Sequence, residues 1–169
     1  MKKLLSVIMA LALSMTLFTA CGGNGNNATA TYDVNEIVTK INDAVPVAMA
    51  GDFTEEELTM MVGLNSEDIA SWAGKYAMVN VSSDRLIVIE AAEGKVDVVK
   101  AALETYKENV ASQFELYLAD QYDKAKAGRV VVKGNYVLLA ILGDGQVVVD
   151  EGVEAAYAPV DAAIDEAFK

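Results

Sequence analysis

Histidine is absent from this chain of 169 residues, and cysteine occurs once, at position 21. Without histidine the sequence lacks the side chain that titrates near neutral pH, the usual Ser-His and Cys-His catalytic pairs, and a common metal ligand. A single cysteine also excludes an intramolecular disulfide. No phosphate-binding glycine loop or dinucleotide-binding glycine pattern is present, and Gly143-Asp144-Gly145 lacks EF-hand spacing. We therefore expect no catalytic residues, no cofactor and no metal.

Basic residues are scarce as well. The chain has 13 Lys and Arg against 25 Asp and Glu, a formal net charge of −12. Such a surface repels phosphate backbones, which excludes nucleic acid as a partner. The simplest interpretation is that the acidity keeps a domain soluble, and the alternative is a cationic partner or loosely held divalent ions.

The N-terminal residues indicate where the protein goes. Lys2 and Lys3 precede an apolar run, Leu4 to Ala20, which ends at Cys21. This is the layout of a signal peptide, and a small residue directly before cysteine is typical of bacterial lipoproteins. The run is shorter than the ~20 residues of a membrane-spanning helix. We expect residues 1–20 to be removed and Cys21 to carry the lipid, which places the protein at the extracytoplasmic face of the cell membrane. Loss of the two lysines, with no acidic residue before Cys21, changes the charge to −14.

The remaining chain divides into a tether and one domain. Residues 21–32 comprise Cys21 and a stretch rich in Gly, Asn, Ala and Thr, a composition that predicts a flexible linker. Residues 33–169 predict a single α+β domain. Its N-terminal part is helical: Asp33 caps an apolar stripe that stops near Pro46, Thr54 and Glu57 form a capping box, and Ser66 opens a short helix toward Trp72.

Two strand pairs follow. The predicted strands are 76–81 and 86–92 around Ser82-Ser83-Asp84, then 129–132 and 136–142 around Lys133-Gly134-Asn135. A long amphipathic helix from Lys95 separates the pairs, and a last helix through Phe168 is interrupted by Pro159. We expect a four-stranded antiparallel sheet with helices packed on one face.

A shift of 51 positions aligns the two pairs and their following helices, for example Tyr106 with Tyr157. Two explanations stay open: a duplicated strand-strand-helix unit, or turn glycines and β-branched residues that any two such units share.

Polar and aromatic side chains suggest one candidate binding surface. Asp120, Gln121 and Tyr122 end the long helical segment, and Asn135 and Tyr136 lie in the second hairpin. Aromatic residues at these spacings are first of all a core signal, so packing is the competing interpretation. If a cleft exists, we expect it where these two segments meet.

The same segments carry a family resemblance. Gly63-Leu64, Asn80-Val81-Ser82, Asp120-Gln121-Tyr122 and the run Val132 to Val137, in this order behind a lipoprotein-type leader, resemble domain-of-unknown-function family 4358. The resemblance covers about Thr54 to Leu142. It implies a small exported lipoprotein of Gram-positive bacteria, and the family offers no activity, cofactor or catalytic residue to transfer.

These observations predict a lipid-anchored, extracytoplasmic binding or protein-interaction domain without catalysis. Its expected contacts are the membrane, through Cys21, and an envelope protein or a small ligand. Two alternatives remain: a cell-envelope hydrolase that uses two carboxyl groups, and a small-molecule carrier, which requires an apolar pocket with a few convergent polar groups.

Overall fold

A computed structural model describes residues 31–169, in which five antiparallel strands form one sheet of order β1-β2-β3-β5-β4. The predicted signal peptide and Cys21 lie outside these residues. The strands are β1 (Ala50–Asp52), β2 (Ile69–Ala77), β3 (Arg85–Ala91), β4 (Arg129–Lys133) and β5 (Tyr136–Ile141).

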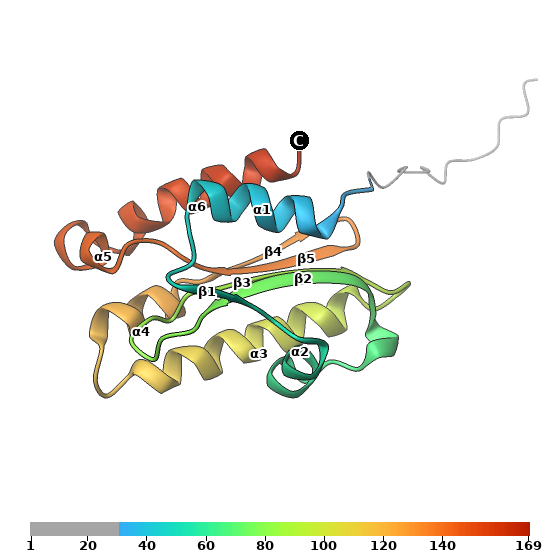
Figure 1. Ribbon diagram of the computed structural model, residues 1–169, viewed down its shortest axis with the longest axis horizontal. Helices are drawn as coiled ribbons and strands as arrows, with labels where there is room; N and C mark the ends of the chain where they lie inside the picture. The colour runs from blue at the N-terminus through green and yellow to red at the C-terminus, as the bar shows by residue number, and fades with distance from the viewer. Residues whose placement is uncertain (1–30) are drawn as a thin grey trace, which may run out of the picture.

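Helices cover both faces of the sheet (Figure 1). On one face lie α1 (Val34–Ala44) and α6 (Val153–Ala167), and on the other lie α2 (Glu55–Val62), α3 (Val96–Phe114) and α4 (Ala119–Lys126). A short helix α5 (Gly145–Glu151) precedes α6, and a 3₁₀ turn η1 (Ser66–Asp68) precedes β2. The α+β class is confirmed.

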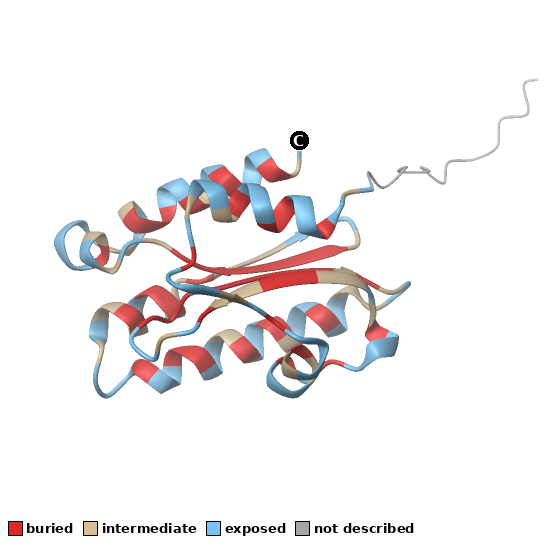
Figure 2. Ribbon diagram, viewed as in Figure 1, coloured by how far each residue is buried: buried red, intermediate tan, exposed pale blue. Residues whose placement is uncertain are grey.

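The central strands explain why both faces are covered. In β3, Leu86 and Val88 face α1 and α6, whereas Ile87 and Ile89 face α3. Every residue of β5 is buried, and the sheet forms the buried layer between exposed helix surfaces (Figure 2). A strand that is apolar at odd and even positions must be buried on both sides. The expectation of helices on one face was therefore wrong.

The expected number of strands was also wrong, because the sheet gains β1. Its residues Ala-Gly-Asp have little strand propensity, but their backbone pairs with Lys75 to Ala77 of β2. β2 also starts earlier than predicted, at Ile69, so Trp72 is in a strand rather than at the end of a helix. Beyond Ala77 the chain leaves the sheet, and residues 78–84 form the connection to β3.

Helix ends follow the predicted capping. The Asp33 side chain accepts hydrogen bonds from the backbone N–H groups of Asn35 (2.7 Å) and Glu36 (3.3 Å). Thr54 and Glu57 form the predicted reciprocal capping box at α2. The last helix differs, because α6 continues through Pro159. Since proline has no N–H, the Ala155 carbonyl lacks its usual helical donor.

No two-fold rotation superimposes one strand pair and its following helix on the other strand pair and its following helix. A two-fold axis that exchanges the antiparallel neighbours β3 and β5 must be perpendicular to the sheet, so it would leave both following helices on one face. Instead α3 packs against Ile87 and Leu139, and α6 packs on the opposite face with Leu86 and Leu138. Shared local patterns therefore explain the 51-residue similarity better than an intact duplicated unit.

One end of the sheet is closed by aromatic side chains. Tyr32, which the sequence assigned to the tether, packs edge-on against Tyr136 (ring centroids 5.5 Å apart) and Phe168 (5.2 Å). The Tyr136 hydroxyl donates to the Tyr32 carbonyl and accepts from the Tyr32 N–H, each at 2.9 Å. We call these three residues the aromatic closure. They fix the start of the described chain beside β5 and the C-terminus.

Candidate functional site

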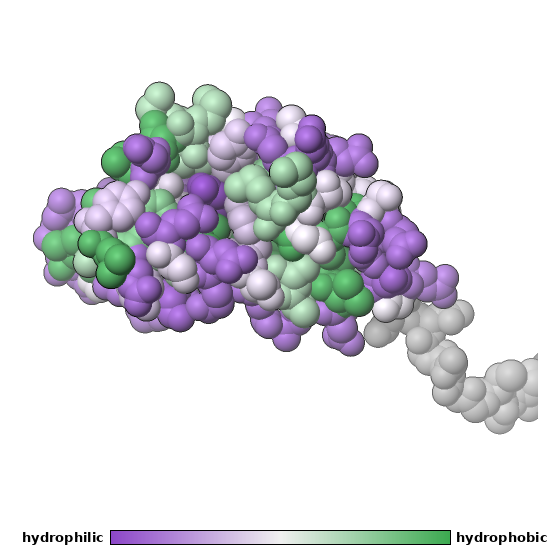
Figure 3. Space-filling model, turned by 90° about the horizontal axis from the view of Figure 1, so that it is seen from below, coloured by the Kyte–Doolittle hydropathy of each residue, from purple (hydrophilic) through white to green (hydrophobic). Residues whose placement is uncertain are grey.

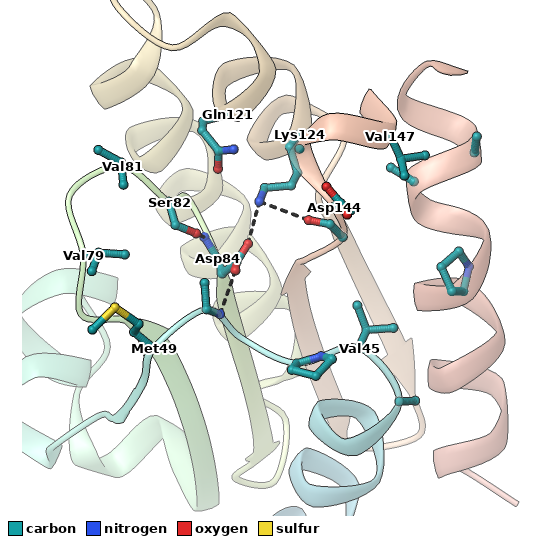
Figure 4. A pocket seen from close by; sticks show the side chains of 18 residues that line it. Val45, Met49, Val79, Val81, Ser82, Asp84, Gln121, Lys124, Asp144 and Val147 are labelled. Atoms are coloured by element: carbon teal, nitrogen blue, oxygen red, sulfur yellow. Dashed lines mark hydrogen bonds and ion pairs between the residues drawn. The ribbon is translucent and has the colours of Figure 1, made fainter. Parts of the chain in front are cut away.

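A cavity of about 720 Å³ lies at the other end of the sheet, where α1 and β5 end and α4, α5 and α6 begin. Its walls come from five separate segments of the chain (Figure 4). Most of the wall side chains are apolar, among them Val45, Pro46, Met49, Val79, Val81 and Val147. An apolar cavity of this size is typical of small-molecule sites.

A buried ion pair forms the polar floor of the cavity. Lys124 Nζ lies 2.6 Å from Asp84 Oδ1, and the two side chains are only 3% and 6% exposed. Lys124 Nζ also donates to the Gly143 carbonyl at 3.2 Å, and Asp84 Oδ2 accepts from the Ala48 N–H at 2.9 Å. Such additional hydrogen bonds are what a buried ion pair needs to offset the loss of its hydration.

Neighbouring polar groups hold this floor in place. Gln121 Oε1 accepts from the backbone N–H (2.9 Å) and the hydroxyl (3.1 Å) of Ser83. Its Nε2 donates to Asp120 Oδ2 at 2.6 Å. On the α6 side, the Tyr157 hydroxyl donates to the Lys124 carbonyl at 2.7 Å. Burial raises the pKa of Tyr157, so the phenol stays a neutral donor.

Hydrogen-bond donors remain for a ligand. An ammonium group has three N–H donors, and Lys124 uses two of them within residues 31–169. Gln121 Nε2 uses one of its two. Ser82, which also lines the cavity, accepts from the Asp84 N–H, and its own hydroxyl hydrogen is donated to no group in the described part of the chain. The site therefore suits an apolar molecule that carries a hydrogen-bond acceptor such as a carbonyl oxygen.

The acidic groups at the cavity have structural partners already. Asp84 is held by Lys124 and Ala48, and Asp144 Oδ1 accepts from the Gln146 N–H at 2.7 Å, which caps α5. Across residues 31–169, no three acidic or cysteine side chains are grouped so that they could hold a metal ion. The same residues contain no helix of the length and hydropathy needed to span a membrane.

The structure does not bring all the predicted site residues together. Gln121 lines the cavity, and Asp120 holds it. Tyr122, however, packs with the core between the sheet and α3. Asn135 and Tyr136 stand at the opposite end of β5 from Gly143, about 25 Å away at ~3.3 Å per residue. The prediction that residues 120–122 and residues 135–136 meet at one cleft was therefore wrong.

The second segment has contacts of its own. Asn135 Nδ2 donates to Glu90 Oε1 at 2.9 Å, while its Oδ1 is buried without a hydrogen-bond partner in the described residues. Tyr136 belongs to the aromatic closure. Packing thus accounts for Tyr136.

Sequence reasoning missed Asp84 and Lys124, the two residues at the centre of the floor. Asp84 was assigned to a turn only. Lys124 had one usable signal: it follows Gln121 by three positions and precedes Ala125, so all three lie on one face of a helix, and all three are buried. A lysine inside the buried stripe of an amphipathic helix indicates a buried partner.

The fold and the site define an α+β domain with one closed and one hollow end. The chain belongs to the family described as Domain of unknown function (DUF4358), whose model matches residues 43–142. Neither a curated protein nor a solved structure matches the chain. The family region supplies Asp84, Gln121 and Lys124, whereas the wall formed by α5 and α6 lies beyond it.

Proposed function

We propose that this protein is a non-catalytic binding protein, held at the extracytoplasmic face of the cell membrane by a lipid on Cys21, that binds a small, largely apolar ligand. The observation that carries the proposal is the cavity of about 720 Å³ with apolar walls and the Asp84–Lys124 pair in its floor. This combines the two features expected of a carrier, an apolar pocket and a few convergent polar groups.

The polar groups favour binding over acid–base chemistry. A glycosidase-type mechanism needs one carboxyl group that can give a proton and one that can act as base or nucleophile. Asp84 is fixed by Lys124 and a backbone N–H, and Asp144 by the α5 terminus. The hydrolase alternative therefore has weaker support than the carrier alternative.

The position of the cavity agrees with membrane anchoring through the N-terminus. The described chain begins beside the aromatic closure, and the cavity lies between elements at the opposite end of the sheet. Two of these elements, α4 and α5, stand at the far end of the domain from the start of α1 (Figure 1). A protein attached through residues before Tyr32 would present its cavity away from the attachment point. A small ligand in the envelope could then enter without passing between the domain and the membrane.

A filled cavity tests ligand binding. Val147 lines the cavity, whereas Val149, on the same helix, is 66% exposed and does not. We expect the fluorescent probe 8-anilinonaphthalene-1-sulfonate to bind the unaltered chain and Val149→Trp alike, and Val147→Trp at least tenfold more weakly. Equal binding by all three proteins would place the probe elsewhere and overturn the cavity as the site.

Membrane attachment is tested separately. Cys21→Ala removes the only thiol that could carry a lipid. The variant should accumulate with an uncleaved leader or leave the membrane fraction, while Ser14→Ala, inside the apolar run, should fractionate like the parent. Normal cleavage and retention of Cys21→Ala would disprove the lipid anchor without affecting the cavity experiment.

A further inference from the structure

Arg85 is a buried cation that has no anionic partner among residues 31–169. Its residue is 8% exposed at the start of β3. Nε donates to the Tyr106 hydroxyl at 3.1 Å, and Nη1 donates to the Asp84 carbonyl at 2.7 Å. The guanidinium carbon also lies 5.7 Å from the centre of the Tyr76 ring. All three partners are neutral groups.

This lack of pairing is unusual for the molecule. Arg129 contacts two carboxylates, Asp161 at 2.9 Å and Glu154 at 3.2 Å. By contrast, none of the ion pairs within residues 31–169 involves Arg85. The chain has almost twice as many acidic as basic residues, so carboxylates are not in short supply. Burying a charge without a counter-charge is costly.

The carboxylates near Arg85 form hydrogen bonds with other groups. Asp84 turns its side chain to Lys124 and Ala48, and only its carbonyl reaches Arg85. Glu57 accepts from the Tyr76 hydroxyl at 3.2 Å and from Thr54, whose backbone N–H holds the pKa of Glu57 below its ordinary value. Asp84, Lys124 and Arg85 together carry one net positive charge inside an acidic protein.

Arg85 lines a shallow pocket of about 410 Å³. Its other lining residues include Met61, Tyr76, Met78 and Asn80. Met61 and Met78 are 42% and 62% exposed. On the face of the molecule that α3 covers, separate hydrophobic patches interrupt a hydrophilic surface (Figure 3). The connection from Met78 to Asp84 separates this pocket from the cavity, and Val79 lines both.

We propose that this pocket binds a carboxylate carried on a short apolar group, either as a free acid or as the C-terminal residue of a peptide. A guanidinium has five N–H donors, and Arg85 uses two of them within the described residues. The remaining donors are on Nη1 and Nη2, and a guanidinium can bind both oxygens of a carboxylate through that pair of nitrogens. The methionine side chains are flexible and polarizable, so they fit apolar groups of different shapes.

The test compares acids with their amides. Hexanoate represents a free acid and N-acetyl-leucine a peptide C-terminus; hexanamide and N-acetyl-leucinamide have the same shapes without the charge. Each is titrated into the full chain as purified, and binding is followed by NMR through the Arg85 Nε–H signal and the Met61 and Met78 methyl signals. We expect saturable shifts with at least one acid and at least tenfold weaker binding of its amide. The preferred acid distinguishes the two ligand sources.

Two variants locate the site. Arg85→Lys keeps the charge but loses the fork, and should weaken the acid at least tenfold, while Arg129→Lys should not. If Arg85→Lys fails to fold, Met78→Trp obstructs the pocket with Arg85 intact; its control is Met60→Trp, which is 75% exposed and outside the pocket lining. Equal binding of acid and amide, unchanged acid binding by Met78→Trp, or no shift at Arg85 would overturn the proposal.

Discussion

The two ends of the sheet use buried polar groups in different ways. At the aromatic closure, the Tyr136 hydroxyl satisfies both backbone groups of Tyr32, and rings fill the space around them. At the hollow end, Lys124, Gln121 and Ser82 are held in place, yet each has a donor beside the cavity that no group within residues 31–169 accepts. The polar group at the closed end has all its hydrogen bonds within the protein and has a structural role. The polar groups at the hollow end are fixed but have donors left over, which is what a binding site needs.

Breaking the ion pair at the hollow end should have the largest effect. Lys124→Met leaves Asp84 buried without its counter-charge, and such changes cost about 3–5 kcal/mol of unfolding free energy. Lys126→Met, two residues further along α4, removes an exposed pair with Glu108 and should cost much less, because solvent screens an exposed pair. Urea unfolding measures both. A similar loss for the two variants would show that the floor contributes no more than a surface pair.

Alanine substitutions of two glycines compare the room for an added Cβ atom at the hollow end and at the closed end of the sheet. A Cβ at Gly143, where φ is +107°, would lie 2.8 Å from the Ala156 carbonyl oxygen. Gly143→Ala should cost about 2–4 kcal/mol from backbone strain and overpacking together. Gly94, near the closed end, has φ of +74° and nothing within 4 Å. Gly94→Ala should therefore cost only about 1–2 kcal/mol. Equal losses in thermal or urea unfolding would contradict close packing at Gly143.

Removal of one hydroxyl should weaken the closed end without affecting the cavity. Tyr136→Phe leaves the Tyr32 N–H and carbonyl without their partner, a loss of about 1–2 kcal/mol. Tyr122→Phe is the control, because the Tyr122 hydroxyl makes no hydrogen bond within residues 31–169; it should change stability by less than about 0.5 kcal/mol. Probe binding should be unchanged in both, and weaker probe binding by Tyr136→Phe would show that the two ends are coupled.

Lowering the pH should destabilise the fold at the closed end through Asp68, by less than the substitutions above. The hydrogen bond from Lys95 Nζ (2.8 Å) holds the pKa of Asp68 below its ordinary value of 3.8. Because the unfolded chain binds this proton more readily, the stabilisation is complete above 3.8 and is lost as the pH falls toward the lower pKa of the folded state. Asp68→Asn should flatten the fall in melting temperature below about pH 4. Parallel curves for the two proteins would refute the contribution of Asp68.

Local signals predicted the starts of α1 and α2 well, because caps and amphipathic stripes depend on residues three or four positions apart, but the expected long helix ends at Phe114 and is followed by the separate α4, and α5 was not predicted. Asp33, Thr54 and Glu57 act as their spacing indicated. The continuous apolar stretches of β3 and β5 also indicated a sheet that is buried on both faces. The hairpin pattern, however, does not specify which face of the sheet each helix covers. β1 could not be predicted because backbone pairing, not side-chain propensity, makes it a strand.

The candidate site was predictable only in part. Gln121 was chosen for its polar and aromatic neighbours, and it does line the cavity. Its partner Ser83 is 38 positions away, and Asp84 and Lys124 are 40 apart. Contacts at such separations depend on how the connection from Met78 to Asp84 folds back against α4. No periodicity in one sequence contains that information.

The aromatic closure also determines where mechanical load enters the domain. Tyr32 is bonded to β5, a central strand flanked by β3 and β4, and its hydroxyl donates to the Phe168 carbonyl at the other terminus. Tension applied through the preceding residues therefore pulls on an interior strand of the sheet and on the end of α6 at once. The edge strand β1, which has three paired residues, does not carry this tension directly.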